Sequence, residues 1–347
     1  MDKVRTDDSR FENLPDYSFE PNYLQVPFSD TSSKDSLSEE NSLRMHYLDE
    51  GEGQVILCMH GQPSWSYLYR KMIPLLVAGG YRVIAPDLIG FGKSDKPTKR
   101  ESYTYANHVT WVKSLVEQLD LTAITLFCQD WGGLIGLRVA TENQHRFARI
   151  VTANTGLPDA QGIADDKIEE ISTQMRAYYD SIAIPANPAE MAMAMASDKT
   201  GMGFMHWVKY CDQSAEFSPQ AVLTMSGAGQ LNEAEQQAYG APFPDETYLA
   251  GGRQFPSLVP IIPDNPAIKA NRAAWKVLEQ WDIPFLTAFS DSDPVTKGGH
   301  VRFQESVPGA KGQAHVTIKG AGHFLQDQAP VELAEATMNF ITANPVK

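Results

Sequence analysis

The residue best suited to chemistry is Asp130, in the turn 128–133 with the sequence CQDWGG. An apolar run (121–127) precedes this turn and a second apolar segment (134–140) follows it. The pattern predicts a strand, a tight glycine-bearing turn and a helix. Such a turn is strained and lifts the side chain at its tip clear of the sheet, where a nucleophile is commonly found.

A carboxylate at this position favours displacement at an alkyl carbon, because the ester that it forms can later be hydrolysed. A serine that made the same attack would be left as an ether, which water does not readily cleave. Asp130 therefore predicts cleavage of a carbon–halogen bond or of an epoxide C–O bond, rather than hydrolysis of peptides or lipid esters.

Two later residues complete the chain order of nucleophile, acid and histidine. Asp293 lies in FSDSDP (289–294) and His323 lies in GAGHF (320–324), each just past a predicted strand. Their side chains are therefore expected to reach the same crevice as Asp130. Asp291 is on the same loop and stays an alternative acid. Asn154 ends the sixth predicted strand and cannot hold a charge there.

Backbone N–H groups are the expected donors to an oxyanion. The segment HGQPSW (60–65) follows the third predicted strand, where a second amide donor is usually supplied. We expect the backbone N–H groups of Gln62 and Trp131 to form this pair. His60 is expected to brace the loop.

Two tryptophans bear on the choice of leaving group. The indole N–H is a donor without an acceptor role, so Trp131 and Trp207 together could hold a departing halide. Epoxide opening needs acidic O–H groups instead, normally from two tyrosines. Tyr178, Tyr179 and Tyr210 keep an epoxide hydrolase open as the alternative.

Two further alternatives fit the residues less well. Hydrolysis of a fluoroacetate-type substrate requires arginines beside the nucleophile, whereas Trp131 and Leu134 occupy that region. A non-catalytic ligand receptor built on the same scaffold would not need the full set of nucleophile, acid and histidine.

The remaining segments alternate between strand-like and helix-like patterns, which predicts a doubly wound, mostly parallel sheet. A polar segment (30–41) is expected to form an exposed turn between two early strands. After the first of these early strands, which precedes residue 30, the predicted strands are 43–49, 55–59, 81–86, 121–127, 149–154, 284–289 and 315–318. The clearest predicted helices are 104–119 and 330–339.

This alternation stops after residue 154. Residues 157–256 are mainly helical in pattern, rich in methionine and interrupted by Pro and Gly. We expect them to form a helical cap domain, inserted into a core domain of residues 1–156 and 257–347. Active sites form where strand C-termini meet such an insertion.

Composition excludes several classes of protein. The chain of 347 residues has a net charge of −14 and a pI near 5.0, which argues against nucleic acid or an anionic membrane as partner. No run approaches the roughly 18 apolar residues of a membrane span. The N-terminus lacks the apolar core of a signal peptide. Cys58, Cys128 and Cys211 have no disulfide or zinc spacing, so a reducing cytoplasm is expected.

Taken together, these motifs resemble those of the haloalkane dehalogenases, a family of the α/β-hydrolase superfamily. The likeness is greatest to the subfamily with an Asp-His-Asp triad and a second halide-holding tryptophan in the cap. It covers nearly the whole chain, from residues 10–15 to His323. The segments that carry it are 60–70, 90–97, 129–133 and 241–245.

The resemblance implies an α/β-hydrolase fold with an inserted helical cap, and cleavage of haloalkanes to alcohol, halide and a proton without a cofactor or metal. It implies Asp130 as nucleophile, His323 as base, Asp293 as its orienting acid, and Trp131 and Trp207 as halide donors. Leu134, Phe204, Phe243 and Pro244 match positions that line the family's substrate pocket.

The expected partners are therefore a small apolar haloalkane, water and halide, and the oligomeric state is left open between monomer and homodimer. Gln62 departs from the Glu or Asn that is commoner after His-Gly, so its side-chain role is undefined. The segment between Gly156 and Trp207 is longer than expected for the family.

Overall fold

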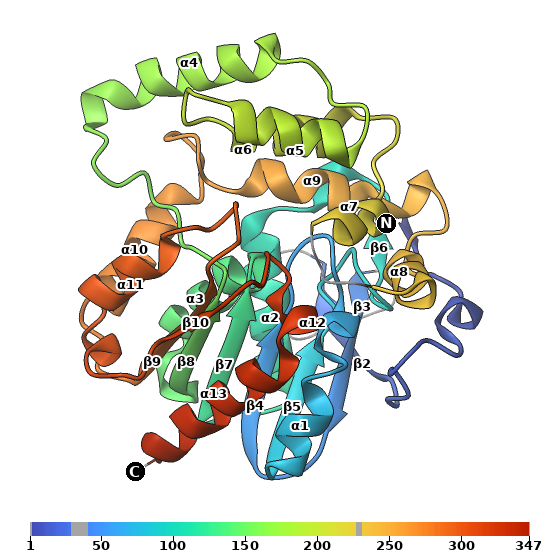
Figure 1. Ribbon diagram of the computed structural model, residues 1–347, viewed down its shortest axis with the longest axis vertical. Helices are drawn as coiled ribbons and strands as arrows, with labels where there is room; N and C mark the ends of the chain where they lie inside the picture. The colour runs from blue at the N-terminus through green and yellow to red at the C-terminus, as the bar shows by residue number, and fades with distance from the viewer. Residues whose placement is uncertain (1, 29–40, 227–230, 347) are drawn as a thin grey trace.

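The computed structural model describes residues 2–28, 41–226 and 231–346, and within these ranges the main sheet has eight strands (Figure 1). Their order is β10-β9-β8-β7-β4-β5-β3-β2. The strands are β2 (Asn22–Pro27), β3 (Ser42–Glu50), β4 (Gln54–Met59), β5 (Tyr81–Pro86), β7 (Ile124–Gln129), β8 (Phe147–Ala153), β9 (Phe285–Ser290) and β10 (Val316–Ile318). β3 pairs antiparallel with β2 and β5, and every other pair is parallel. The mostly parallel sheet is thus confirmed.

The central strands are apolar throughout because both faces of the sheet are covered. Residues 55–59 of β4 and all of β7 are buried, as expected for parallel strands between two layers of helices. The predicted strands recur in the structure with small shifts at their ends. The largest shift is at β7, which begins three residues after the predicted start because Leu121 to Ala123 form the irregular segment that leads into it.

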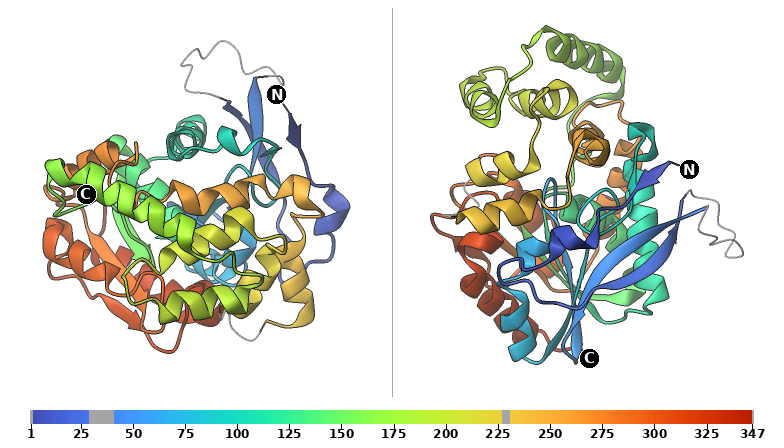
Figure 2. Two further views of the ribbon diagram at one scale, coloured as in Figure 1. Left: turned by 90° about the horizontal axis from the view of Figure 1, so that it is seen from above. Right: turned by 90° about the vertical axis from the view of Figure 1, so that its right-hand side faces the viewer.

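Helices cover both faces of the sheet (Figures 1 and 2). α1 (Ile73–Ala78) packs against α13 (Pro330–Ala343) on one face. α2 (Tyr105–Gln118) and α3 (Trp131–Glu142) pack together on the other, followed by α10 (Ile268–Leu278) and α11 (Gly299–Ser306). The predicted helices at 104–119 and 330–339 are confirmed, and the second continues to Ala343.

The inserted segment is helical, as predicted, and lies over the C-terminal ends of the strands (Figure 1). Its helices are α4 (Ile168–Ser181), α5 (Pro188–Ser197), α6 (Phe204–Gln213), α7 (Pro219–Met225), α8 (Glu233–Gly240) and α9 (Ala250–Leu258). A small apolar cluster of its own includes Met191, Tyr210 and Phe217. The division into core and cap domains stays a prediction, and α9 runs two residues past the predicted boundary at 256.

A buried ion-pair network joins this insertion to the sheet. The Arg70 guanidinium is fully buried and lies 2.7 Å from both Glu235 on α8 and Asp327 on the short helix α12 (Leu325–Gln328). Lys71 approaches the same two carboxylates. Buried charges need such pairing, because an unpaired one would be strongly destabilising. The network therefore ties the cap to the helix that directly follows the loop of His323.

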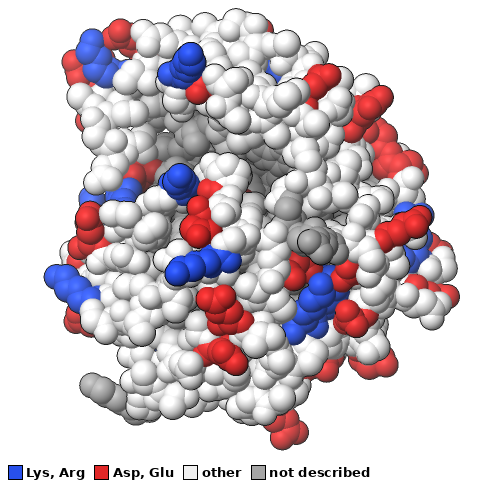
Figure 3. Space-filling view, viewed as in Figure 1, with Lys and Arg blue, Asp and Glu red and all other residues white. Residues whose placement is uncertain are grey.

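Two sequence predictions concern the periphery. The exposed turn expected at 30–41 lies, apart from Asn41, outside the described residues. Among the helices that are described, none has the length and apolar character to cross a membrane. Figure 3 shows charged side chains of both signs dispersed over one face, and a hollow between the cap helices and the core.

Candidate active site

Asp130 is positioned by a strained backbone between β7 and α3. Its φ of +51° lies in the left-handed region that non-glycine residues rarely adopt, at a cost of about 1–3 kcal/mol. The surroundings hold this conformation. The Asp130 N–H donates to the carbonyl of Asn154 at 3.0 Å, and the Thr155 hydroxyl donates to the Asp130 carbonyl at 2.7 Å. The sharp turn predicted from CQDWGG is confirmed.

Glycines next to this turn allow its close approach to the neighbouring strand. A Cβ at Gly61 would collide with the Asp130 carboxylate, and a Cβ at Gly132 would collide with the Met59 carbonyl at the end of β4. Both positions therefore require glycine if the turn is to lie against β4.

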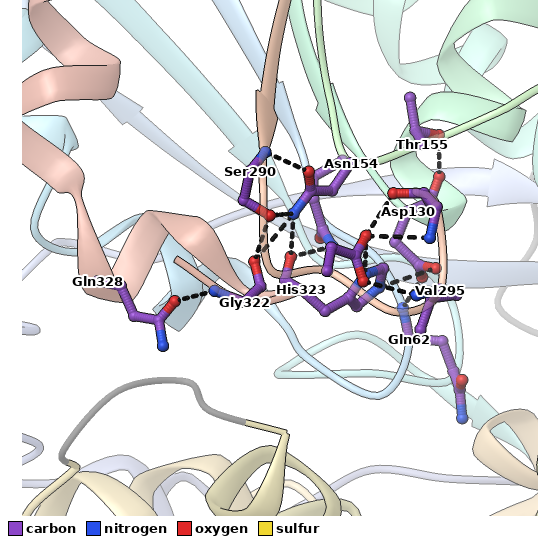
Figure 4. Close-up of polar contacts among 12 residues, drawn as sticks. Gln62, Asp130, Asn154, Thr155, Ser290, Val295, Gly322, His323 and Gln328 are labelled. Carbon is purple, nitrogen blue, oxygen red and sulfur yellow. Dashed lines mark hydrogen bonds and ion pairs between the residues drawn. The ribbon is translucent and has the colours of Figure 1, made fainter. Parts of the chain in front are cut away.

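The two oxygens of the Asp130 carboxylate have different neighbours (Figure 4). Oδ1 accepts a hydrogen bond from the Gln62 backbone N–H at 2.8 Å, and Oδ2 lies 3.4 Å from Nε2 of His323. The Asp130 side chain is 19% exposed, so an approaching molecule can reach it. One oxygen is thus held by an amide while the other faces the histidine.

The loop that carries Gln62 is held at several points. The Gln62 side chain donates from Nε2 to the Gly252 carbonyl on α9 at 2.9 Å, which gives its side chain a structural contact with the cap. His60 accepts from the Leu88 N–H at 2.9 Å and contacts the Gly61 carbonyl through its other ring nitrogen. His60 therefore braces the loop, as predicted.

His323 is paired with Asp293 on the side away from Asp130. Nδ1 of His323 lies 3.0 Å from Oδ2 of Asp293, whose side chain is almost fully buried. The Asp293 carboxylate also accepts from the backbone N–H groups of Val295 at 2.9 Å and Thr296 at 3.1 Å, and from the Thr296 hydroxyl. These bonds fix the carboxylate behind the imidazole.

The alternative acid, Asp291, has other contacts. It is exposed, and its Oδ1 accepts from the Gly320 N–H at 2.8 Å and from the Ser292 hydroxyl. The geometry therefore supports Asp293 as the partner of His323 and gives Asp291 the role of closing the loop.

Charge stabilises this arrangement. Burial alone raises the pKa of Asp293, but the charge and hydrogen bond of His323 and the bond from Thr296 outweigh it, and the pKa falls to about 2. Burial lowers the pKa of His323, but the charge of Asp293 and the hydrogen bonds to both carboxylates raise it to about 10. The two carboxylates beside His323 therefore favour its protonated form.

The two predicted halide donors lie on different layers. Trp131 is the first residue of α3, is almost fully buried, and packs edge-on against Tyr105 and Phe255, with ring centroids 5.2 Å and 4.9 Å away. Trp207 is half-buried on α6 and packs beside Tyr210 in the cap cluster. Their roles toward a halide stay predictions.

The three tyrosines on which the epoxide alternative depends donate their hydroxyl groups to acceptors in the cap. The hydroxyl of Tyr178 donates to Asp198, that of Tyr179 to Asp212, and that of Tyr210 to the Glu216 carbonyl at 3.1 Å. Burial raises the pKa of Tyr210 to about 12. A weakly acidic hydroxyl that already donates to a cap acceptor is poorly suited to protonate an epoxide oxygen.

The predicted pocket residues differ in exposure. Leu134 is buried on the first turn of α3, and Phe204 is half-buried at the start of α6. Phe243 is half-buried and Pro244 is exposed. Phe243 also borders a cavity of about 600 Å³ between residues 10–15 and helices α7 and α8, whose lining contains no triad residue. The assignment of these four residues to the substrate pocket stays a prediction.

Several residues outside the predicted set support the triad from behind. Gln129 donates from Nε2 to the His323 carbonyl at 3.1 Å, and Asn154 and Thr155 bind the loops around Asp130. Their polar side chains at the ends of β7 and β8 were the signal in the sequence. Within the part of the chain that the structure describes, there is no group of three or more His, Cys, Asp or Glu side chains placed to hold a metal ion.

Comparison with known proteins adds a family match. The family model described as alpha/beta hydrolase fold matches residues 54–330. A haloalkane dehalogenase from Psychrobacter cryohalolentis is 47% identical over 347 residues, which cover 99% of this chain and 100% of that protein. A haloalkane dehalogenase from Mycobacterium marinum is 43% identical, with 98% and 100% covered.

Solved structures agree with these sequence matches. The tetrameric haloalkane dehalogenase DpaA from Paraglaciecola agarilytica NO2 superimposes with a TM-score of 0.71 at 31% identity, covering 96% of this chain and 97% of that one. Haloalkane dehalogenase DbeA from Bradyrhizobium elkani USDA94 has a TM-score of 0.64 at 21% identity, covering 93% and 98%, and supports the fold alone.

Proposed function

This chain belongs to the haloalkane dehalogenases, hydrolases with the α/β-hydrolase fold, and we propose that its carbon–halogen cleavage runs through an alkyl ester on Asp130. One observation carries the proposal. Oδ1 of the Asp130 carboxylate accepts a hydrogen bond from the backbone N–H of Gln62, and Oδ2 lies beside Nε2 of His323, with Asp293 on the other side of the histidine.

In the first step, Oδ2 of Asp130 attacks the carbon that bears the halogen. A C–O bond forms, the carbon–halogen bond breaks, and the halide leaves with the bonding electron pair. A carboxylate needs no base for this attack, so the step depends on its orientation. The hydrogen bond from the Gln62 N–H to Oδ1 leaves Oδ2 as the attacking oxygen.

The leaving halide requires donors that do not compete as acceptors. Trp131 lies next to the nucleophile in the chain, and Trp207 faces it from the cap in this proposal. Hydrogen bonds to a charged group contribute about 1.5–3 kcal/mol each. Their contribution grows as negative charge builds up on the halogen, so they favour the transition state over the bound substrate.

In the second step, water attacks the carbonyl carbon of the Asp130 ester. His323 removes the proton of the water while Asp293 stabilises the resulting imidazolium. The oxyanion develops on Oδ1, where the backbone N–H groups of Gln62 and Trp131 receive it. Collapse breaks the bond to the alkoxy oxygen, which takes a proton from His323. The products are an alcohol, halide and a proton, and the Asp130 carboxylate is restored.

The raised pKa of His323 is compatible with a base because it depends on the charge of Asp130. Esterification removes that charge, and with it one of the two carboxylates that hold the proton on the imidazole. The pKa of His323 then falls, which favours the neutral imidazole when water must be activated. The first step thus prepares the base for the second.

The substrate and location follow from coarser observations. We infer a small apolar haloalkane as substrate from the family to which the chain belongs. We infer the cytoplasm as location because the three cysteines are buried and unpaired and the chain is acidic. The epoxide alternative is disfavoured by the engaged hydroxyls of Tyr178, Tyr179 and Tyr210. A ligand receptor is disfavoured by the complete triad.

Replacement of the nucleophile tests the proposal. Asp130→Ala should abolish halide release from 1-bromobutane, because no other carboxylate occupies the turn. Thermal unfolding of the variant, compared with wild type, controls for the fold. Turnover within about tenfold of wild type, an increase of less than about 1.4 kcal/mol in the activation free energy, would rule out the ester on Asp130.

A further inference from the structure

We propose that Asn154 is a positioning residue whose one amide side chain holds the loops of the base and the acid in register with the nucleophile. Asn154 directly follows β8 and lies beside Asp130, Ser290 and the loop of His323. This inference rests on the ester mechanism proposed above, because its effect is assigned to one step of that mechanism.

Asn154 contacts the turn of Asp130, the end of β9 and the loop of His323 (Figure 4). Its Nδ2 donates to the Ser290 hydroxyl at 2.8 Å, to the Gly322 carbonyl at 2.9 Å and to the His323 carbonyl at 3.2 Å. Its Oδ1 accepts from the Ser290 N–H at 2.9 Å, and its backbone carbonyl accepts from the Asp130 N–H at 3.0 Å. One residue therefore bridges the ends of β7 and β9 and the loop of the histidine.

The amide is the group that these contacts require. Asn154 is fully buried, and its side chain donates to two carbonyls and accepts from one N–H. Each carbonyl also accepts from a second side chain, Ser290 for Gly322 and Gln129 for His323. Asparagine supplies both functions, whereas a carboxylate would set acceptors against the carbonyls. The φ of +40° is also one that asparagine tolerates better than most residues.

The contacts determine where the imidazole lies. Gly322 and His323 are held through their carbonyls by Asn154, and the Ser290 hydroxyl donates to the Gly322 carbonyl at 3.0 Å. Ser290 is the last residue of β9, from which the chain leads to Asp293, so the segments of both the base and its acid are held by the Asn154 amide. A displacement of about 1 Å in such an arrangement can cost a hundredfold in rate.

The two steps of the reaction depend on this amide to different degrees. Attack by Asp130 needs the carboxylate and its Gln62 contact, and the bond from the Asp130 N–H goes to the backbone of Asn154, which substitution leaves in place. Hydrolysis of the ester needs His323 and Asp293 in register. Loss of the side chain should therefore slow ester hydrolysis far more than alkylation.

The test variant is Asn154→Gly, which permits the positive φ and removes the amide. The matched control is Asn143→Ala, which deletes a buried amide that donates to the Val139 carbonyl at 2.8 Å at the far end of α3. Rapid-quench experiments with 1-bromobutane separate the two rates, and intact mass detects the ester. We expect hydrolysis to slow roughly ten- to a hundredfold in Asn154→Gly, alkylation to stay within about threefold, and the ester to accumulate. The control should show neither change.

A second variant guards against a simple loss of stability. Ser290→Ala removes one of the bridged groups, so it should slow hydrolysis less than Asn154→Gly, and the double variant should fall short of the product of the two effects. Equal slowing of both steps in Asn154→Gly, or full additivity with Ser290→Ala, would overturn the role. If His323→Phe accumulates the ester and Asn154→Gly does not, only the role of Asn154 fails. Absence of any ester in both variants refutes the ester mechanism, and this inference with it.

Discussion

Nε2 of His323 lies 3.4 Å from Oδ2 of Asp130, and the other carboxylate oxygen, Oδ1, accepts a hydrogen bond from the backbone N–H of Gln62. The carboxylates on both sides of His323 favour its proton, and a protonated His323 would make this contact an ion pair. In the mechanism that we propose, the same contact would place the imidazole beside the ester bond, so that one arrangement suits both the free carboxylate and its ester.

Removal of the base should separate the two steps. His323→Phe leaves alkylation possible, because a carboxylate needs no activation, but leaves the ester without a base. We expect a burst of about one halide per enzyme and an intact-mass increase equal to the alkyl group. Wild-type enzyme under the same conditions should turn over steadily without the adduct. Steady turnover by the variant would assign the base to another residue.

The two aspartates on the loop after β9 should differ sharply. Asp293→Ala removes the carboxylate 3.0 Å from Nδ1 of His323, so hydrolysis should slow by orders of magnitude. Asp291→Ala removes an exposed acceptor of the Gly320 N–H and should have a much smaller effect. Steady-state halide release from the two variants gives the ranking, and the reverse order would transfer the acid to Asp291.

Neutralisation of Asp130 should lower the pKa of His323. Asp130→Asn keeps the shape of the side chain but removes a charge that raises this pKa toward about 10. Imidazole signals followed by NMR over a pH titration should place the transition of His323 at a lower pH in the variant, with intact mass used to verify that the amide persists. An unchanged transition would mean that Asp130 does not set the protonation of the base.

The same shift has a consequence for stability. The pKa of His323 is raised in the folded enzyme above its unfolded value near 6.5, so its contribution to the free energy of unfolding is complete below about pH 6.5. The contribution is lost as the pH rises through about 10. The difference in unfolding free energy between wild type and Asp130→Asn that arises from this charge should therefore shrink over that interval.

The sequence predicted which candidate catalytic residues lie together better than it predicted the residues that hold them in place. Asp130, Asp293 and His323 were found because each follows a strand in the required chain order, and the structure brings them together. The sequence marks Asn154 only as a residue without a charge, since one sequence does not show that the end of β9 and the loop of His323 converge on its amide. The choice between Asp291 and Asp293 likewise required the structure, because both residues closely follow the same strand and only the structure shows which carboxylate contacts His323.

The predicted strands and helices also agree with the structure to different degrees. Strands with a continuous apolar run, such as 55–59, were predicted closely because both of their faces are buried. Their ends were less exact, as at β7, because the apolar segment at 121–123 continues the pattern of the strand. The cap helices were expected as a group, but their individual contacts depend on packing that the 3.6-residue period does not specify.

Trp207 offers the sharpest test of the leaving group. Trp207→Phe retains much of the ring that packs beside Tyr210 but deletes the N–H donor. With about 1.5–3 kcal/mol at stake, cleavage of the carbon–halogen bond should slow roughly ten- to a hundredfold. Chloride should be affected more than bromide, because it is the poorer leaving group and develops more charge that needs stabilisation. Halide binding, followed by quenching of tryptophan fluorescence, should weaken in the same variant.

The remaining outcomes distinguish the donor from the cap as a whole. Tyr210→Phe is the matched control, because the Tyr210 hydroxyl donates to the Glu216 carbonyl and should leave both halide cleavage and halide binding unchanged. If Trp207→Phe is silent while Trp131→Phe weakens halide binding, another cap residue is the second donor. If neither tryptophan affects halide binding and Tyr210→Phe or Tyr179→Phe abolishes the opening of an epoxide, the hydroxyls act in catalysis and the assignment of both indoles to the leaving group is wrong.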